Sequence, residues 1–394
     1  MLEKVQKRGW RQVKFGDVVR LSKARLADPL AEGVERFVGL EHLEPGDLRI
    51  RRWGNVADGT TFTNVFQPGQ VLFGKRRAYQ RKVAVADFAG VCSGDIYVLE
   101  SKDAGVLLPQ LLPFLCQTEA FFEHAIGTSA GSLSPRTNWT SLARFEFALP
   151  PLEEQRSAVT VLQAATDHGH AIEGAYSAAG RVMQSYKDTL IGSDASSDAK
   201  DCLLGDLFLG SPESGCSAPP RDAATGHFVL GLAALARNGY VPGDYKPVEP
   251  TSKMLAAKLT AGDLLISRSN TLDRVGYVGI FDDLRDDVSF PDTMMRLRPN
   301  PAFILPSFLE ALLQTTAARN YLMSIAAGTS ASMKKINRAN LPKMTLKIPS
   351  LRAQGTSLER LNELKHAMEA QRARLEAARQ LRKLIAARVI EGQL

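Results

Sequence analysis

The sequence predicts an α+β protein made of two similar α/β domains, each followed by a long helix, with an internal pseudo-twofold repeat. The first observation is a junction at residues 149–155, where an apolar, strand-like run ends and a long helical pattern begins. Proline suits this position, because it lacks a backbone donor and is tolerated in the first turn of a helix. The junction occurs twice, since three of its residues return 199 positions later: Pro150, Leu152 and Gln155 correspond to Pro349, Leu351 and Gln354.

Matches along the two halves are the second observation. Residues 69–73 correspond to residues 262–266, in each case a turn glycine followed by an apolar strand. Leu-Pro and Gln-Thr bracket a predicted helix in both halves, and Gly-Thr-Ser-Ala at residues 127–130 recurs unchanged at residues 328–331. Separations between 189 and 201 residues indicate a duplicated domain, because solenoid repeats have much shorter periods.

Heptad seams in the two predicted helices are the third observation. After Gln155, apolar or small residues recur at alternating steps of four and three. The same spacing recurs after Gln354, with two polar exceptions. A helix with such a stripe needs a partner. Two surface helices on separate cores are one possibility, but a seam in both copies of a repeat favours an antiparallel coiled coil. The positions are Ala158, Leu162, Ala165, Gly169, Ile172, Tyr176, Ala179, Met183, Tyr186 and Leu190, then Leu361, Leu364, Met368, Gln371, Leu375, Ala378, Arg382, Ile385 and Val389.

These patterns predict five segments. Residues 1–152 form the first domain, residues 153–192 the first helix, residues 201–350 the second domain and residues 351–394 the second helix. Between the first helix and the second domain, residues 193–200 are mostly small and polar, which is the composition of a linker.

The composition is that of a soluble globular protein with a basic balance. Its 49 Lys and Arg exceed its 42 Asp and Glu, giving a net charge of +7, which favours a polyanionic partner. The four cysteines form no C-x-x-C pair, so neither a zinc ribbon nor a disulfide framework is expected. No apolar run is long enough to span a membrane and no signal peptide is visible, so we expect a cytoplasmic protein.

No catalytic, cofactor or metal site is expected. Residues 69–76 resemble a phosphate-binding loop, but Arg76 stands where the motif needs a hydroxyl to hold magnesium. Asp292 and its counterpart Asp95 lack the nearby acidic-x-Lys pair of a nuclease. An enzyme with an unrecognised site is therefore disfavoured, and an assay of the lone chain for methyl transfer or nuclease activity would decide it.

Basic loops carry the chemistry that is visible. Residues 67–86 and residues 311–358 are rich in cations and contain no acid, so they can neutralise phosphates, while Arg, Lys and Asn can pair with guanine and adenine edges. A merely solvated basic face is the alternative. Because the loops recur in a duplicated frame, we predict these DNA-binding residues: Lys75, Arg76, Arg77, Tyr79, Arg81, Lys82, Arg136, Asn138, Arg268, Asn270, Arg274, Lys334, Lys335, Asn337 and Arg338.

The repeated Leu-Pro-Pro-Leu-Glu-Glu-Gln junction, the long helices and the two variable loops make the whole chain resemble the specificity subunit of type I restriction-modification systems. The resemblance implies two target-recognition domains that each read half of a split double-stranded DNA site. It also implies a non-catalytic subunit, because adenine methylation and ATP-driven cleavage reside in its partners. These would be modification (methyltransferase) subunits, two of them by expectation, and restriction subunits, which are the ATP-dependent translocase and nuclease.

The resemblance further assigns the junction residues to structure and to partner contact. These residues are Leu152, Glu153, Gln155, Leu351 and Gln354, although the second copy departs from the pattern at Ser350, Arg352 and Ala353. The remaining alternative is a noncatalytic two-domain scaffold that binds proteins through a helical hairpin. A salt-sensitive DNA shift would separate these two interpretations.

Overall fold

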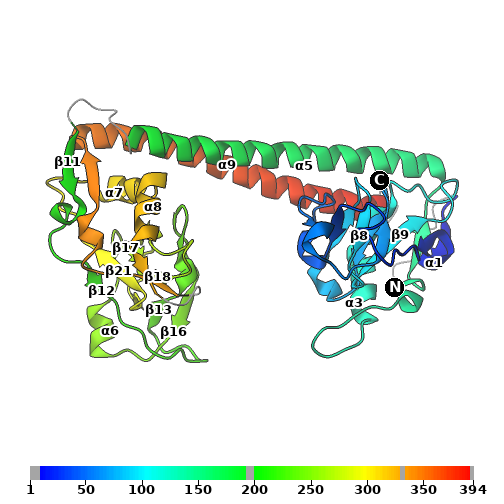
Figure 1. Cartoon of the computed structure of the whole chain (residues 1–394), viewed down its shortest axis with the longest axis horizontal. Helices are drawn as coiled ribbons and strands as arrows, with labels where there is room; N and C mark the ends of the chain where they lie inside the picture. The colour runs from blue at the N-terminus through cyan, green and yellow to red at the C-terminus, as the bar shows by residue number, and fades with distance from the viewer. Residues whose placement is uncertain (1–8, 192–198, 329–332, 391–394) are drawn as a thin grey trace. The chain divides into compact units, whose positions relative to one another are not determined.

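The computed structural model describes residues 9–191, 199–328 and 333–390, which divide into two compact units. Unit 1 comprises residues 1–173 and 373–394, and unit 2 comprises residues 174–372. The long helices α5 (Leu152–Tyr186) and α9 (Leu351–Ile390) each contribute to both units (Figure 1). Most of the predicted linker, and Thr329, Ser330 and Ala331 of the repeated Gly-Thr-Ser-Ala motif, lie outside the described residues.

Unit 1 is built from one strand pair, two four-stranded sheets and short helices. Its first sheet has the order β2-β9-β6-β7 and its second the order β4-β3-β8-β5, while β1 pairs with β10. The strands are β1 (Arg11–Lys14), β2 (Val19–Leu21), β3 (Arg36–Val38), β4 (Gly54–Asn55), β5 (Asn64–Phe66), β6 (Val71–Gly74), β7 (Val83–Val85), β8 (Gly90–Cys92), β9 (Ile96–Ser101) and β10 (Glu146–Leu149). The helices are α1 (Phe15–Val18), α2 (Leu112–Cys116), α3 (Glu119–Gly127) and α4 (Trp139–Leu142).

Unit 2 has a related arrangement with smaller sheets. Its sheets have the orders β12-β21-β17-β19, β16-β13-β20 and β18-β23-β22, while β11 pairs with β24 and β14 with β15. The strands are β11 (Lys200–Leu203), β12 (Glu213–Ser214), β13 (Phe228–Leu230), β14 (Leu235–Ala236), β15 (Gly239–Tyr240), β16 (Tyr245–Pro247), β17 (Leu264–Ser267), β18 (Ser269–Asn270), β19 (Val278–Ile280), β20 (Val288–Ser289), β21 (Met294–Leu297), β22 (Ala326–Ala327), β23 (Lys334–Ile336) and β24 (Thr345–Ile348). The helices are α6 (Ser252–Ala256), α7 (Pro306–Leu313) and α8 (Thr316–Ser324).

Matching local structures confirm the internal repeat. The turn glycines Gly69 and Gly262 both have positive φ, at 86° and 97°, a conformation that glycine adopts without a steric penalty. Helices α2 and α7 are followed by the C-cap residues Gln117 and Gln314, and the next residues, Thr118 and Thr315, each cap the following helix with their hydroxyl. The parallel pairing of β3 with β8 recurs as the pairing of β13 with β20.

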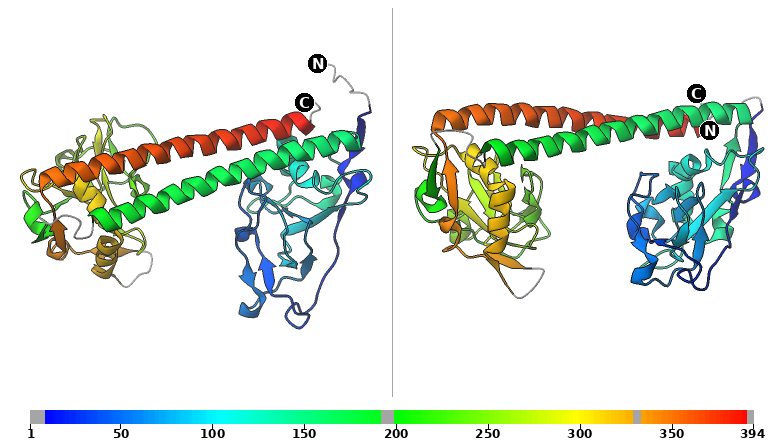
Figure 2. Two further views of the ribbon diagram at one scale, coloured as in Figure 1. Left: turned by 90° about the horizontal axis from the view of Figure 1, so that it is seen from above. Right: turned by 45° about the horizontal axis from the view of Figure 1, so that its top comes forward.

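The two long helices pack side by side as an antiparallel coiled coil, which confirms the prediction from the heptad seams. In unit 1 the beginning of α5 joins the end of α9 in one core, and in unit 2 the end of α5 joins the beginning of α9 (Figure 2). Every seam position whose side chain is described is buried or half-buried, and Leu162 and Leu361 are 0% and 1% exposed. The seam therefore supplies apolar surface to both cores.

A buried glutamine fastens the first turn of each long helix to its own unit. The Gln155 side chain accepts a hydrogen bond from Leu108 N and donates to the carbonyl oxygens of Val106 and Pro150, each at 2.9 Å. Gln354 makes the same three bonds, each at 2.9 Å, to Leu305 N, Phe303 O and Pro349 O. Both glutamines are 0% exposed, so the motif repeats because each unit needs this connection.

Lys187, in the π-helical turn Lys187–Ile191 that follows α5, is a buried cation that the sequence did not single out. It is 1% exposed and donates to Gln314 Oε1 at 2.7 Å. Burial, helped by the positive charge of Lys365, lowers the pKa of Lys187 from 10.5 to about 8. Between these pH values the unfolded chain holds a proton that the folded chain has released, so the stability due to this group rises with pH.

We therefore expect Lys187→Met to remove part of the pH dependence of folding. The free energy of unfolding of the wild type should gain up to about 3 kcal/mol relative to the variant between pH 8 and pH 10.5. Urea unfolding of both proteins across this range measures the difference. Lys200→Met, at an exposed position of the same unit, should keep the wild-type behaviour, and a constant difference between wild type and Lys187→Met would contradict the expectation.

Candidate nucleic-acid interface

Unit 1 brings together two basic segments that lie far apart in the sequence. The loop after β6 carries Lys75, Arg76 and Arg77, and it lies against residues 130–137. Arg76 forms a β-bridge with Arg136, Thr137 N donates to Lys75 O at 3.0 Å, and Arg77 N donates to Pro135 O at 2.7 Å. The predicted cations of both segments thus form one cluster, which we call the unit 1 basic cluster: Lys75, Arg76, Arg77 and Arg136.

Asp95 lies at the centre of the unit 1 basic cluster. Its carboxylate accepts from Arg76 Nη1 at 3.1 Å and from Arg136 Nε at 2.8 Å. Burial raises the pKa of Asp95, but hydrogen bonds from Arg136 and Arg76 outweigh it and hold the pKa below the usual range. Asp95 pairs with two of the four cations, so the cluster keeps a surplus of positive charge.

Aromatic and hydroxyl groups position the other members of the cluster. The Lys75 ammonium lies 4.7 Å from the centre of the Tyr97 ring, and burial lowers the pKa of Lys75. Ser134 Oγ accepts from Arg76 Nη2 at 3.0 Å and from Arg77 Nη2 at 3.2 Å. The cations therefore have defined orientations, which reduces the conformational entropy lost when a ligand binds.

The backbone of this loop is strained at two predicted residues. Arg77 and Arg81 have φ values of 54° and 56°, the left-handed region that side chains other than glycine enter rarely. No other non-glycine residue in the described ranges has positive φ. Strain of this kind persists where the surrounding structure imposes it, and it clusters at binding sites.

Other predicted residues of unit 1 have structural partners. Arg81 forms a two-pronged ion pair with Glu119, Lys82 donates to Leu40 O at 2.6 Å, and Asn138 accepts from Ser141 N as the cap of α4. Arg81 and Lys82 are therefore engaged within the unit, and Asn138 stabilises a helix. Tyr79 is 52% exposed and remains accessible.

Unit 2 brings its two basic segments together by strand pairing. Strand β18 pairs with β23, which aligns Ser269 with Lys335 and Asn270 with Lys334. Arg268 N donates to Thr293 O at 2.8 Å and Ile336 N donates to Arg268 O at 2.9 Å, so Arg268 joins the two segments. The repeat thus places matched loops together in both units.

Asn270 does not have the position that base reading requires. It is 7% exposed, its Oδ1 accepts from Thr271 N at 2.9 Å, and its Nδ2 donates to Ser267 Oγ at 3.4 Å. Both ends of the Asn270 amide are used inside the domain, and its contact with DNA stays a prediction. No signal in the sequence could have found this, since a buried and an exposed asparagine look alike in a polar loop.

Several predicted residues of unit 2 are accessible. Lys335, Arg338 and Arg274 are exposed, and the side chains of Lys335 and Arg338 make no hydrogen bond or ion pair with another described residue. Lys334 is half-buried and donates to Gly328 O, while exposed Asn337 caps a turn by accepting from Ala339 N at 2.9 Å. We call Lys334, Lys335 and Arg338 the unit 2 basic strip.

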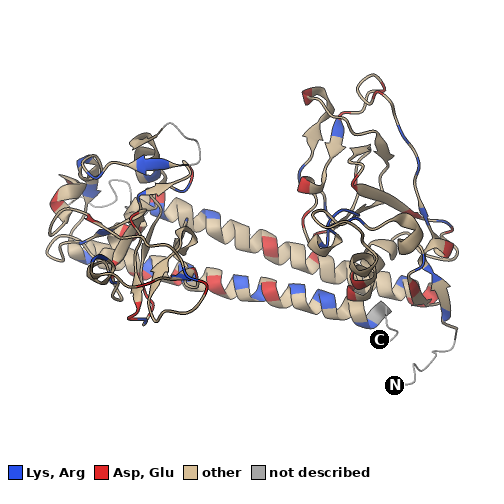
Figure 3. Cartoon of the chain, turned by 90° about the horizontal axis from the view of Figure 1, so that it is seen from below, with Lys and Arg blue, Asp and Glu red and all other residues tan. Residues whose placement is uncertain are grey.

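Some organising residues were missed by sequence reasoning. Arg319, in the acid-free segment, donates to the carbonyl oxygens of Val275 at 2.7 Å and Asp273 at 3.0 Å, so it holds a loop. Asp95 and Glu119 neutralise cations of a loop that has no acid in its own sequence. Figure 3 shows basic and acidic positions interspersed over both units. An acid-free stretch of sequence is therefore not an acid-free surface.

The junction residues differ in their access to a partner. Glu153 and Leu351 are exposed and Leu152 is half-buried, so these three can be contacted from outside. Gln155 and Gln354 are buried and hydrogen-bonded within their units, and their contact with a partner stays a prediction. Their role is to hold the start of each helix.

We expect Asp95→Asn to strengthen non-specific DNA binding. The change removes the charge partner of Arg76 and Arg136. The salt slope, which is the slope of the logarithm of the binding constant against the logarithm of salt concentration, should therefore steepen by about 1 to 2. Fluorescence anisotropy with an arbitrary duplex over a range of salt measures the slope. Asp58→Asn removes an exposed carboxylate of the same unit and serves as the control. Equal salt slopes for the two variants would show that the unit 1 basic cluster does not approach DNA.

Two further findings concern the described residues alone. Among them, no group of histidine, cysteine, aspartate and glutamate side chains could hold a metal ion. None of the helices in those same ranges combines the length and the hydropathy that a membrane span needs.

Comparison with solved structures defines the class of fold. A chain from a structure described as the structural basis of complex assembly and conformational transition of the type I R-M system superposes with a TM-score of 0.61 at 18% identity, covering 98% of this chain and 99% of that chain. The type I restriction-modification system S subunit from M. genitalium gives a TM-score of 0.51 at 12% identity over 98% of each chain. The chain has the fold of these two proteins.

Comparison of sequences adds a family match over part of the chain. Residues 7–176 match the type I restriction modification DNA specificity domain. The EcoDI specificity subunit of Escherichia coli is 28% identical over 174 residues, 42% of this chain and 36% of that relative. The EcoKI specificity subunit of Escherichia coli strain K12 is 23% identical over 286 residues, 66% of this chain and 60% of that relative. These matches confirm the resemblance to type I specificity subunits, and they span only part of both relatives.

Proposed function

We propose that this chain is the non-catalytic DNA-reading subunit of a type I restriction-modification complex. The observation that carries the proposal is the pairing of two basic segments in both units: the unit 1 basic cluster is joined by the bridge from Arg76 to Arg136, and the unit 2 basic strip by the pairing of β18 with β23. Two copies of one reading surface suit a bipartite double-stranded DNA site, with one half-site for each unit.

The two surfaces differ in how they would contact DNA. In unit 1, the guanidinium groups of Arg76 and Arg136 are oriented by Asp95, which suits paired hydrogen bonds to a guanine edge. In unit 2, the side chains of Lys335 and Arg338 are exposed and unrestrained by described neighbours, which suits phosphate contact. Base reading would thus fall mainly to oriented side chains and affinity mainly to exposed ones.

The chain would dock the catalytic subunits through the exposed part of each helix start. Glu153, Leu152 and Leu351 are accessible there, whereas their neighbours Gln155 and Gln354 are buried. Modification subunits would supply adenine methylation and restriction subunits the ATP-driven cleavage, so the chain itself needs no catalytic group. The number of modification subunits, two by expectation from the repeat, belongs to this proposal.

Binding of the lone chain to duplex DNA tests the reading function. We expect salt-sensitive binding, and we expect methylated adenines mapped in the host genome to define a two-part site. A noncatalytic protein-binding scaffold is the competing function, supported by the ion pairs that engage Arg81 and Arg76 within unit 1. Binding that is absent at low salt would favour the scaffold and end the DNA-reading proposal.

A further inference from the structure

Three segments of unit 2 meet beside the unit 2 basic strip. Thr293 O accepts from Arg268 N at 2.8 Å and from Ser269 N at 3.0 Å, and Ser269 pairs with Lys335 of β23. Hydrogen-bonded neighbours of this kind lie roughly 5 Å apart, so Thr293 is within about 10 Å of Lys335. The major groove of B-DNA is about 12 Å wide. A groove that meets the basic strip therefore also reaches the residue before Thr293, which is Asp292.

Asp292 is exposed and held in one orientation. Its Oδ1 accepts from Ser217 Oγ at 2.5 Å, and its backbone N–H donates to the same hydroxyl oxygen at 3.3 Å. The two segments are in close contact, because a Cβ at Gly215 would lie 2.3 Å from the carbonyl oxygens of Phe290 and Pro291. Oδ2 of Asp292 has no hydrogen-bond partner among the described residues. The carboxylate thus offers one fixed and unused acceptor to solvent.

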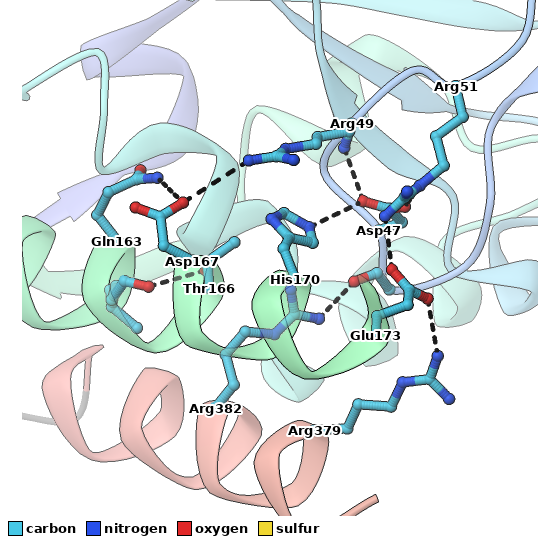
Figure 4. A network of polar contacts seen from close by, with 12 residues as sticks. Asp47, Arg49, Arg51, Gln163, Thr166, Asp167, His170, Glu173, Arg379 and Arg382 are labelled. Atoms are coloured by element: carbon cyan, nitrogen blue, oxygen red, sulfur yellow. Dashed lines mark hydrogen bonds and ion pairs between the residues drawn. The ribbon is translucent and has the colours of Figure 1, made fainter. Parts of the chain in front are cut away.

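No cation of the described residues forms an ion pair with Asp292, although Arg268 is bonded to the next residue. Other carboxylates of this protein are consumed by ion pairs. In unit 1, Asp47 lies 2.6 Å from Arg51, and Glu173 lies 2.6 Å from Arg51 and 3.3 Å from Arg379 (Figure 4). Asp292 is therefore free to accept from a ligand.

The shared frame of the two units does not account for Asp292. In sequence its counterpart is Asp95, but the backbone hydrogen bonds match Asp95 with Thr293 instead. Asp95 O and Thr293 O accept from the matched N–H groups of Lys75 and Arg268, at 3.0 Å and 2.8 Å. This alignment places Asp292 opposite a glycine of unit 1. The fold of one unit is thus built without this carboxylate, which marks Asp292 as a feature of the surface of unit 2.

A carboxylate at a DNA surface is repelled by phosphates, so it lowers affinity for the backbone. In the major groove it can accept from the amino groups of cytosine and adenine, whereas guanine and thymine present acceptor oxygens. Unit 2 has few other oriented groups for this task. Lys335 and Arg338 suit phosphates, and the Asn270 amide is used inside the domain.

We propose that Asp292 is a specificity-determining residue of unit 2, which accepts a hydrogen bond from cytosine N4 or adenine N6 in the major groove of its half-site. The carboxylate rejects guanine and thymine at this position, because an acceptor would face an acceptor. Ser217 is a positioning residue, since its hydroxyl fixes Oδ1 and leaves Oδ2 for the base. The inference rests on the proposed DNA-reading function.

Selection of binding sites from randomised duplexes by the full chain tests the proposal. The wild type should select cytosine or adenine at one position of one half-site. Asp292→Ala should lose this preference and keep the rest of the site, while it binds an arbitrary duplex more tightly because one negative charge is gone. Asp222→Ala removes another exposed carboxylate of unit 2 and should select the wild-type site. An unchanged site for Asp292→Ala would overturn the proposal.

Base analogues then identify the hydrogen bond. The selected duplex is made with 2-pyrimidinone in place of the cytosine, or with purine in place of the adenine, so that only the exocyclic amino group is lost. The wild type should bind this duplex about 10-fold more weakly. Asp292→Ala should bind both duplexes equally, and Ser217→Ala should show a smaller loss than the wild type. An equal loss in wild type and Asp292→Ala would assign the amino group to another side chain and refute the role of Asp292.

The same selection separates this proposal from the reading function. A wild-type chain that binds no duplex at low salt would end the DNA-reading function and the role of Asp292 together. A wild-type chain that selects a two-part site, with Asp292→Ala selecting that same site, would overturn the role of Asp292 alone.

Discussion

Gln155→Met should lower the stability of unit 1 by about 3–5 kcal/mol, because three buried hydrogen bonds are removed at once. Methionine fills a similar volume but leaves Leu108 N without an acceptor and the carbonyl oxygens of Val106 and Pro150 without a donor. Each buried polar group left unpaired costs about 1–3 kcal/mol of stability. The summed cost of the unpaired groups is therefore several times the stability change caused by an ordinary surface substitution. Hydrogen exchange of the residue 106–108 amides together with urea unfolding measures the destabilisation.

The repeat supplies an internal replicate for this experiment. Gln354→Met should cost about the same and should act on unit 2, because its three partners are equivalent. Arg156→Ala, at the exposed position next to Gln155, is the matched control and should change stability by less than about 0.5 kcal/mol. A cost below about 1 kcal/mol for both glutamine variants would show that water replaces the missing bonds.

Changing Lys75, Arg76 and Arg77 together to alanine should weaken DNA binding by about 10- to 100-fold at moderate salt. If the side chains bind phosphates, the salt slope should fall by about 0.9 for each phosphate that is no longer neutralised. If they bind base edges, discrimination at one half-site should relax by about 1–3 kcal/mol per base pair. Anisotropy titrations over a salt series, with specific and scrambled duplexes, distinguish these two results.

A matched triple variant controls for net charge. Arg11, Lys14 and Arg144 are exposed on or beside the β1 and β10 strand pair of the same unit, and their change to alanine should leave the half-site preference intact. Unchanged affinity and unchanged methylation pattern in the Lys75, Arg76 and Arg77 variant would remove this loop from the interface.

The proposal that each unit reads its own DNA half-site independently can be tested separately. Changing Lys334, Lys335 and Arg338 of the unit 2 basic strip to alanine should alter recognition of one half-site, and the loop variant of unit 1 should alter the other. Sequencing of the adenines methylated by each variant with its modification partner gives the result. Changes at both half-sites from either variant would show that the two units are coupled.

The sequence by itself determined the features that follow from local pattern. Heptad spacing predicted which face of each helix is buried, and the spaced motifs predicted the repeat, because periodicity depends only on neighbouring residues. The positive φ of Gly69 and Gly262 and the capping by Thr118 and Thr315 likewise follow from residue type at a turn or a helix start. These features needed no knowledge of distant partners.

Only the tertiary structure decided which polar groups are accessible. Arg81 meets Glu119, 38 residues away, and Arg136 meets Asp95, 41 residues away, so their availability depends on how distant segments pack. Asn270 and Gln155 read as surface residues in sequence, yet both are buried because the domain supplies their hydrogen-bond partners. Long-range packing sets solvation, and solvation decides whether a polar side chain holds the fold or faces a ligand.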